Sequence, residues 1–353
     1  MTENKGFERK ILMTGGAGFI GSNVLRLMVR KYPQYQFVNL DKLDVCACPG
    51  NLGDVSHLPN YKFVKGSILS PDLVGYLLAN EGIDTIFHFA AQTHVDNSFG
   101  NPLTFTENNV MGTHVLLEAA RAHRLKLFIH VSTDEVYGPS DETCTETKTV
   151  LNPTNPYAAT KMAAEALVKS YAASFNIPVI ITRGNNVFGP GQYPEKLIPK
   201  FVCRLIKGMT CCIHGTGKNV RNFLYVDDVA TAFDLIFHKG EVGGVYNIGT
   251  SFCRSTSEVA SDLLEIMGLQ DQADGLIEHV EDRKYNDHRY TIDTTRLEKL
   301  GWKPATPWKQ GLRQTAQWYK ENMDSWPSVD KALTPHPTFK EDPEPVDLNR
   351  RFT

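Results

Sequence analysis

The chain of 353 residues lacks several features that would place it in a specialised class of protein. No apolar run approaches the roughly 20 residues that a membrane-spanning helix needs, and the polar start of the chain leads us to expect no signal peptide. The formal net charge of −3 gives no basic excess of the kind that nucleic-acid-binding proteins carry. We therefore expect a cytoplasmic protein that binds neither membrane nor nucleic acid.

Cysteines are few and odd in number, at seven, so a disulfide framework is not expected in a chain of this size. Two groups of cysteine and histidine, within 46–57 and 211–214, could be considered as metal ligands. Neither group has the paired two-residue gaps of a structural zinc site. The sequence therefore predicts reduced thiols and no metal.

What the sequence does contain is an alternation of apolar strands and amphipathic helices over its first half. The length suits one dinucleotide-binding core plus a smaller second lobe. Strands that alternate with helices favour parallel pairing with right-handed crossovers. We expect an α/β fold, a Rossmann-like doubly wound parallel sheet over residues 8–183. The predicted strands are 10–14, 36–40, 61–65, 84–89, 126–132 and 178–182, and the predicted helices are 18–31, 71–80, 103–123 and 155–175.

The second half of the chain has a less regular pattern. We assign 184–330 mainly to a smaller C-terminal α/β substrate-binding lobe, and we leave open that some of its strands return to the sheet. Residues 331–353 carry four prolines among charges, so we expect an irregular tail there. The expected helices of the lobe are 194–207, 226–238 and 257–267, and its expected strands are 211–214, 244–248 and 277–280.

A glycine motif stands between the first strand and the first helix. Gly15, Gly18 and Gly21 have the spacing GxxGxxG, which permits a tight turn and a close approach of backbone N–H groups to a pyrophosphate. Asp41 closes the next strand, where a carboxylate can accept hydrogen bonds from both ribose hydroxyls and repel a 2′-phosphate. These residues predict NAD rather than NADP, and a glycine turn needed only for packing is the alternative.

Two further motifs carry candidate catalytic groups. Tyr157 and Lys161 lie one helical turn apart, and a nearby ammonium and a nicotinamide cation would lower the pKa of the phenol. The consecutive Thr133, Asp134 and Glu135 end a predicted strand, and Thr133 could hold the substrate oxygen. Two extra carboxyl groups suggest that water is eliminated as well as hydride moved. An exposed helical pair and a solvated acidic turn are the respective alternatives.

On these motifs the chain resembles the extended short-chain dehydrogenase/reductases, and within them the nucleoside-diphosphate-glucose 4,6-dehydratases. Sister epimerases share the glycine turn and the Tyr–Lys pair but lack the Asp-Glu pair, and related sugar-acid decarboxylases tend to lose the Asp. The consecutive Thr-Asp-Glu is therefore the specific part. The motifs that carry the resemblance are 14–21, 89–96, 132–138, 157–161, 186–190, 194–199, 221–228 and 246–249.

The resemblance implies a mechanism in which the net reaction is a dehydration within deoxysugar (rhamnose-type) biosynthesis. Tyr157, helped by Lys161 and Thr133, removes the C4 hydroxyl proton as C4 gives hydride to NAD. Glu135 then takes the C5 proton, and protonated Asp134 gives a proton to the departing C6 hydroxyl. Hydride returns to C6 and the proton to C5. Two adjacent carboxyl groups in a semi-buried site cannot easily both ionise, which favours a protonated Asp134.

The resemblance also implies binding residues, of which Arg221 and Arg283 are the expected counter-charges of the diphosphate. Ordinary surface arginines are their alternative, and for His94 a structural hydrogen bond is an alternative to catalysis. Many relatives have Asp at Ser67, where it meets the adenine, so that contact is in doubt. The implied cofactor residues are Gly15, Gly18, Phe19, Ile20, Asp41, Ser67, Ile68, Ala90, Tyr157 and Lys161. The implied substrate residues are Thr93, His94, Asn186, Lys196, Leu197, Arg221, Asn247 and Arg283.

The sequence leaves open the nucleotide, the function among close alternatives, and the oligomeric state. The nucleotide is either dTDP or UDP, because different segments resemble the enzymes of each. A nucleotide-sugar 4-epimerase and a non-catalytic NAD-binding regulator are the competing functions. The predicted helices 103–123 and 155–175 carry an extra apolar stripe, and in this superfamily such helices commonly pair as a four-helix bundle. We therefore expect a homodimer, with a monomer as the alternative.

Overall fold

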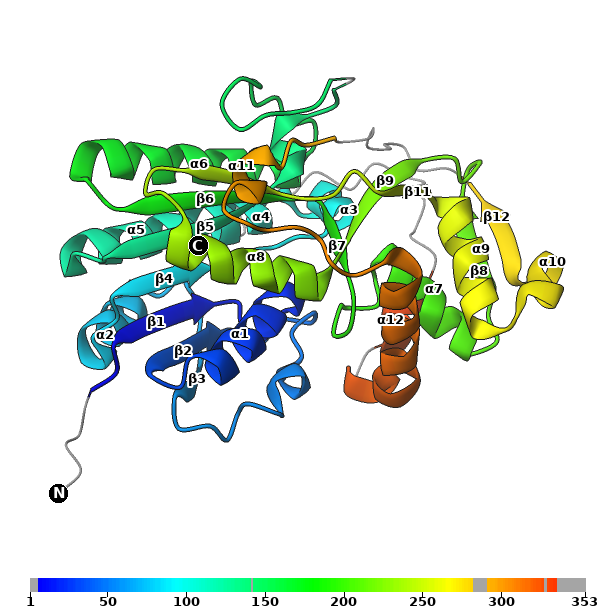
Figure 1. Cartoon of the computed structure of the whole chain (residues 1–353), viewed down its shortest axis with the longest axis horizontal. Helices are drawn as coiled ribbons and strands as arrows, with labels where there is room; N and C mark the ends of the chain where they lie inside the picture. The colour runs from blue at the N-terminus through cyan, green and yellow to red at the C-terminus, as the bar shows by residue number, and fades with distance from the viewer. Residues whose placement is uncertain (1–5, 141, 282–290, 327–328, 335–353) are drawn as a thin grey trace, which may run out of the picture.

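In the computed structural model the described residues are 6–140, 142–281, 291–326 and 329–334. A seven-stranded parallel sheet with the strand order β10-β6-β5-β4-β1-β2-β3 forms the centre of the larger part (Figure 1). The order reverses between β1 and β4, which makes this the topological switch point of a doubly wound sheet. The strands are β1 (Arg9–Thr14), β2 (Tyr35–Asp41), β3 (Tyr61–Lys65), β4 (Thr85–His88), β5 (Leu127–Thr133), β6 (Val179–Gly184) and β10 (Val245–Ile248).

Helices cover both faces of this sheet, because its strands alternate apolar residues between two cores. Ile11 and Met13 of β1 pack with residues of α1 and α8, whereas Leu12 packs with residues of α2, α5 and α6. All three β1 side chains are fully buried, as expected for a parallel strand covered on both faces. The helices are α1 (Phe19–Lys31), α2 (Pro71–Glu81), α5 (Gly112–His123), α6 (Pro156–Phe175), α8 (Val226–Lys239) and α11 (Thr295–Glu298).

The predicted helix 103–123 is interrupted in the structure. Helix α4 (Pro102–Phe105) leads into a π-helical segment, Thr106–Met111, before α5 begins. Within that segment Asn109 accepts a hydrogen bond from Gln92 N (2.8 Å) and donates one to Gln92 O (3.0 Å). These two hydrogen bonds connect the π-helical segment to the loop between β4 and α3 (Val95–Gly100). Because they join residues that are distant in the sequence, helical periodicity alone could not predict the interruption.

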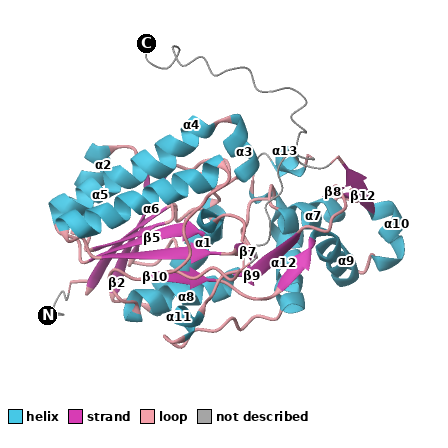
Figure 2. Ribbon diagram, turned by 90° about the horizontal axis from the view of Figure 1, so that it is seen from above, coloured by secondary structure: helices cyan, strands magenta, loops and turns pink. Residues whose placement is uncertain are grey.

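The second lobe has its own core beside the carboxyl edge of the sheet (Figure 2). It holds a three-stranded sheet, β11-β9-β7, and a two-stranded sheet, β12-β8. β10 pairs with β6, so this part of the chain does return to the main sheet. The lobe's elements are β7 (Asn186–Phe188), α7 (Leu197–Ile206), β8 (Cys211–His214), β9 (Val220–Tyr225), β11 (Cys253–Ser255), α9 (Thr256–Met267), α10 (Ala273–Leu276), β12 (Ile277–Val280), α12 (Trp308–Asn322) and α13 (Val329–Leu333).

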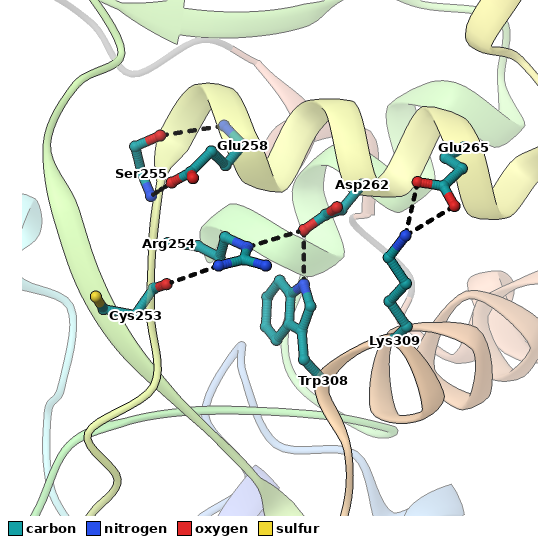
Figure 3. A network of polar contacts seen from close by, with 8 residues as sticks. All are labelled: Cys253, Arg254, Ser255, Glu258, Asp262, Glu265, Trp308 and Lys309. Atoms are coloured by element: carbon teal, nitrogen blue, oxygen red, sulfur yellow. Dashed lines mark hydrogen bonds and ion pairs between the residues drawn. The ribbon is translucent and has the colours of Figure 1, made fainter.

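A polar network joins α9, α12 and β11 within the lobe (Figure 3). Asp262 accepts hydrogen bonds from Trp308 Nε1 (2.7 Å) and Arg254 Nε (3.2 Å). Arg254 lies opposite Arg221 in the β9–β11 register, so the network steadies the strand that carries Arg221. The sequence pattern did not reveal α12, because its anchor depends on this contact between distant segments.

Several expectations can be compared with the described residues. None of their helices is both long and apolar enough to cross a membrane, and no cluster of three or more candidate metal ligands occurs among them. All seven cysteines are free thiols. Of the expected irregular tail 331–353, residues 331–333 belong to α13, and the carbonyl of Leu333 accepts a hydrogen bond from Arg204 of α7. Residues 335–353 lie outside the described part.

Candidate active site

A cavity of about 310 Å³ opens at the carboxyl ends of the central strands. Gly15 and Ala90, which follow β1 and β4, line it at the switch point, and Thr133 and Gly184 line it from the ends of β5 and β6. Ligands of doubly wound sheets bind in this crevice, because the reversal of strand order leaves it open between the helices. The cavity is therefore the candidate active site.

The glycine turn forms one wall of the cavity. Gly15 has a φ of +72°, and a Cβ on it would lie 2.6 Å from Ala90 N. A Cβ on Gly21 would lie 2.5 Å from Gly15 O, and Gly18 is the N-cap of α1. A side chain at Gly15 or Gly21 would overlap the backbone, and the small residues of this turn let a bound anion approach the N-terminus of α1 closely. The residues fit the pyrophosphate of a dinucleotide.

Asp41 lines the same part of the cavity at the end of β2. Its carboxyl group accepts hydrogen bonds from Ala17 N (3.0 Å) and Leu43 N (2.8 Å), which orient it. Burial raises the pKa of Asp41, and the two backbone donors oppose that rise. A carboxylate has more than two acceptor positions, so the group can still accept bonds from ribose hydroxyls.

Thr133 ends β5, and Asp134 and Glu135 begin the 3-10 turn Asp134–Tyr137 that follows it. Thr133 caps the turn by accepting a hydrogen bond from Glu135 N (3.3 Å). Asp134 is 3% exposed, and burial raises its pKa to about 6, while a hydrogen bond from Asn185 opposes that rise. The direction agrees with the expected protonated acid, but the cause is burial rather than repulsion by the adjacent carboxyl group.

Asparagines hold both carboxyl groups. Asn185 Nδ2 donates to Asp134 Oδ2 (2.7 Å), and Asn155 Nδ2 donates to Glu135 Oε2 (2.9 Å). Asn155 is also the N-cap of α6, since its Oδ1 accepts a hydrogen bond from Ala158 N (2.8 Å). The cap that begins the helix of Tyr157 therefore also orients the second acid.

Tyr157 and Lys161 lie on α6 and reach the cavity together with the two acids. Burial, followed by the negative charge of Glu135, raises the pKa of Tyr157, and Lys161 is not among the groups that lower it. Burial and the two carboxyl groups therefore raise the pKa of Tyr157 within the protein alone. The lowering expected from Lys161 together with a nicotinamide cation concerns the cofactor-bound protein and stays a prediction. Burial lowers the pKa of Lys161 to about 8, and the charge of Glu165 opposes this.

Behind the site, Glu165 and Arg183 form a buried ion pair. The guanidinium donates through Nε (2.9 Å) and Nη2 (2.6 Å) to the two carboxylate oxygens. Its Nη1 donates to Tyr137 Oη (2.9 Å), at the end of the acidic turn. The pair links α6 to that turn and so holds the two candidate catalytic motifs in a common arrangement.

The structure brings most predicted site residues to the cavity but not all of them. The residues that line it are Gly15, Gly18, Phe19, Ile20, Asp41, Ile68, Ala90, Thr93, Thr133, Asp134, Glu135, Tyr157, Lys161, Asn186 and Lys196. The predicted residues that are described but do not line it are Ser67, His94, Leu197, Arg221 and Asn247. Arg283 lies outside the described residues.

Several residues of the second group have visible roles in the protein. Ser67 Oγ accepts a hydrogen bond from Leu69 N (3.1 Å) in its own turn. His94 caps α3 by accepting a hydrogen bond from Asn97 N, which is a structural hydrogen bond of the kind that was the alternative for this residue. Asn247 is fully buried and accepts a hydrogen bond from Tyr137 Oη (2.8 Å), so it supports the acidic turn instead of lining the cavity.

Arg221 and Leu197 lie close to the cavity without lining it. The positive charge of Arg221 lowers the pKa of Asp134 slightly, against the larger effect of burial. Leu197 begins α7 directly after Lys196, whose Nζ donates to Thr93 O (3.1 Å). Both residues therefore lie next to residues that line the cavity.

Sequence reasoning missed several polar residues that line the cavity or hold its acids, among them Glu195, Asn155 and Asn185. Glu195 lines the cavity, and its position next to Lys196 was the signal that could have found it. Asn155 and Asn185 are far in sequence from the acids that they hold, and nothing local connects them.

The doubly wound sheet, the glycine turn and the Tyr–Lys pair define a short-chain dehydrogenase/reductase fold with an added lobe. Comparison with known proteins agrees with this class. The chain belongs to the GDP-mannose 4,6 dehydratase family, whose model matches residues 12–315.

Individual relatives give a more specific comparison than the family model does. The chain is 54% identical over 333 residues to a trifunctional UDP-glucose 4,6-dehydratase/UDP-4-keto-6-deoxy-D-glucose 3,5-epimerase/UDP-4-keto-L-rhamnose-reductase of Arabidopsis thaliana. The aligned region covers 93% of this chain and 50% of that protein. It thus spans about half the length of this relative. It is 47% identical over 335 residues to the dTDP-D-glucose 4,6-dehydratase of Homo sapiens, with 94% and 96% covered. The crystal structure of a dTDP-glucose 4,6-dehydratase of Streptomyces venezuelae with NAD bound has a TM-score of 0.85 and 38% identity, with 91% and 99% covered.

Proposed function

We propose that the protein is an NAD-dependent hydro-lyase that converts UDP-glucose or dTDP-glucose to the 4-keto-6-deoxyglucose nucleotide. The observation that carries this proposal is the buried Asp134, whose pKa is raised to about 6 beside Tyr157 and Lys161 in one cavity. A redox enzyme without an elimination step has no need for such an acid. Its presence next to Glu135 supports a step that removes water.

The chemistry follows from where the protein's own groups lie. Tyr157 takes the C4 hydroxyl proton as that carbon is oxidised, and Thr133 holds the oxygen. The new ketone makes the C5 proton acidic, and Glu135 takes it. Asp134 gives its proton to the C6 hydroxyl, which leaves as water, and Glu135 later returns a proton to C5. Bound NAD would accept hydride from C4 and return it to C6, and its cationic ring would favour the phenolate of Tyr157.

The substrate would lie on the side of the cavity that faces the second lobe. Thr93, Asn186 and Lys196 line that side and are the proposed sugar and phosphate contacts. Arg221 is proposed to neutralise part of the diphosphate, because its planar fork can bind two oxygens at once. The relatives act on UDP-glucose or dTDP-glucose by name, so both nucleotides remain candidates.

The proposal is tested by incubating the protein with NAD and either UDP-glucose or dTDP-glucose. A 4-keto-6-deoxy sugar absorbs strongly in alkali, whereas a 4-epimerase yields a hexose without that absorbance and a non-catalytic regulator yields no product. Failure with both substrates would reject the proposal.

A second experiment assigns the C5 base. Glu135→Gln is expected to abolish the exchange of the C5 hydrogen with solvent deuterium, while oxidation at C4 survives. Unchanged deuterium uptake in this variant would remove Glu135 from that role.

We also propose a homodimer, and a cytoplasmic location stays a prediction. Met111 and Phe175, on the helices expected to pair, are 51% and 45% exposed, which supports a covered face. Sedimentation at micromolar concentration tests the dimer, and a monomer there would contradict it.

A further inference from the structure

The side chain of Asp134 accepts hydrogen bonds from the amide of Asn185 and from the hydroxyl of Thr133, and the bond from Asn185 is the shorter of the two. Asn185 directly follows β6 and is 6% exposed. Its Nδ2 lies 2.7 Å from Asp134 Oδ2, and both side chains are buried. A buried bond between an amide and a carboxyl group is stronger than the same bond in water, since little solvent competes for either partner.

Contacts with the segment at the end of β10 and directly after it fix the orientation of the Asn185 amide. Asn185 Oδ1 accepts a hydrogen bond from Thr250 N (3.1 Å), and Asn185 N donates to Ile248 O (3.0 Å). A Cβ at Gly249 would overlap Asn185 Oδ1, so the backbone packs closely against the amide. An exchange of Oδ1 and Nδ2 would bring Nδ2 against an N–H donor and Oδ1 against the carboxyl group. The NH₂ group must therefore face Asp134.

This constraint makes the two oxygens of Asp134 unequal. Oδ2 faces an N–H donor, and an oxygen that accepts such a bond is a poor place for a proton. Thr133 Oγ1 donates a hydrogen bond to Oδ1 (3.3 Å). Unlike an amide NH₂ group, a hydroxyl can also accept a hydrogen bond, so it can turn to accept from a proton on Oδ1. A neutral Asp134 therefore carries its proton on Oδ1, on the side of Thr133.

We propose that Asn185 is a positioning residue that keeps the transferable proton of Asp134 on Oδ1, and this rests on the proposed dehydration. In the elimination step the Oδ1–H bond breaks and its proton joins the C6 oxygen. The C6–O bond breaks with its electron pair, and water leaves. The C5–H electron pair forms the new double bond, and Glu135 holds the C5 proton.

A second consequence concerns pH. The bond from Asn185 stabilises the ionised form of Asp134 and opposes the effect of burial, so its loss would raise the pKa further. The charge of Arg221, together with the bond from Thr133, acts in the same direction as Asn185. Because the general acid works only when protonated, its pKa sets the alkaline limb of the rate profile.

The test uses Asn185→Asp and Asn185→Ser in the full chain with NAD and the better of the two glucose nucleotides. Asn185→Asp keeps an acceptor for Thr250 N but replaces the donor to Asp134 by an oxygen, so the two carboxyl groups must share a proton. The alkaline limb of kcat is expected to move up by at least about one pH unit. Dehydration is expected to slow about tenfold or more, while single-turnover oxidation at C4, followed by nicotinamide absorbance, changes far less.

Asn185→Ser gives the same readouts without a new charge, and we expect a smaller shift in the same direction. If the added carboxyl group of Asn185→Asp prevents folding, Asn185→Ser alone tests the proposal. Asn60 is the matched control, because it is also buried and its Nδ2 donates to the carbonyls of Val29 (3.0 Å) and Tyr32 (3.2 Å). Asn60→Ser is expected to leave the pH profile unchanged.

An alkaline limb that stays in place in the Asn185 variants would overturn the proposal. So would an equal loss of C4 oxidation and dehydration, which is the sign of a merely structural residue. Failure of the proposed function is distinguishable, because the unaltered protein would then form no keto sugar from either nucleotide.

Discussion

Replacing Asp134 by asparagine is expected to stabilise the fold while it removes the proposed general acid. Asparagine has the same shape, and its side-chain oxygen can accept the bond from Asn185 Nδ2, as Asp134 Oδ2 does at 2.7 Å. Its NH₂ group would then face Thr133 Oγ1, which can accept. The substitution therefore removes a buried ionisable group and leaves no partner unsatisfied.

The magnitude follows from the pKa of the acid. Burial raises the pKa of Asp134 from 3.8 to about 6. That is a shift of about two pH units, and each unit corresponds to about 1.4 kcal/mol. Because the folded-state pKa is raised, the contribution of Asp134 to stability is full below pH 3.8 and is lost as the pH rises through about 6. Above that pH, Asp134→Asn is expected to raise the free energy of unfolding by about 3 kcal/mol.

Urea denaturation at a series of pH values measures this effect. The advantage of Asp134→Asn should be small at the acidic end, grow between 3.8 and about 6, and then stay constant. Asp271→Asn, on the exposed side of the second lobe, is the control and should show no such growth. Equal stabilities of Asp134→Asn and the unaltered protein at neutral pH would refute the argument that the ionised form is costly. In the same variant C4 oxidation should persist and dehydration should be lost.

Other substitutions test the remaining parts of the site. Glu165→Gln leaves the guanidinium of Arg183, which is 1% exposed, without its charged partner. The free energy of unfolding, measured by urea titration, should therefore fall by about 3–5 kcal/mol. A loss near zero would contradict a buried ion pair. Asn155→Ala should lower that free energy by about 1 kcal/mol through loss of the helix cap, whereas Asn155→Asp should retain the cap. Both should slow C5 exchange, because Glu135 loses its donor, and normal exchange would argue against that contact. Gly15→Ala should weaken NAD binding in calorimetric titration at least about tenfold, since φ is +72° and the added Cβ would lie 2.6 Å from a backbone nitrogen; unchanged affinity would show that the turn can adjust.

The fold was predictable where the signal is local. β3, β8 and β12 have the bounds that their sequences predict. Of these β8 is largely buried, whereas the residues of β3 and β12 are half-buried or exposed. β9 and α12 were not predicted. Trp308 begins α12 and is held by Asp262 of α9, so that helix depends on a partner far away in the chain.

The site residues also divide into those that local sequence spacing predicts and those that it does not. The glycine turn and the Tyr–Lys spacing were found because each acts over a few neighbouring residues. Asn247 was placed on the substrate by resemblance, but the structure buries it beside Tyr137. Motif matching reports which residue type stands at a position, and it cannot report which way a buried amide points.

By itself the sequence determined the kind of chemistry, because the spacing of a glycine turn, a Tyr–Lys pair and two consecutive acids is a property of the local chain. Only the tertiary structure showed that burial raises the pKa of Asp134 and which of its two oxygens accepts the hydrogen bond of Asn185. Those depend on burial at the end of β5 and on Asn185, which β6 and the segment after β10 bring to Asp134. Desolvation and hydrogen bonding act through space, and their partners here are separated by dozens of residues in the chain.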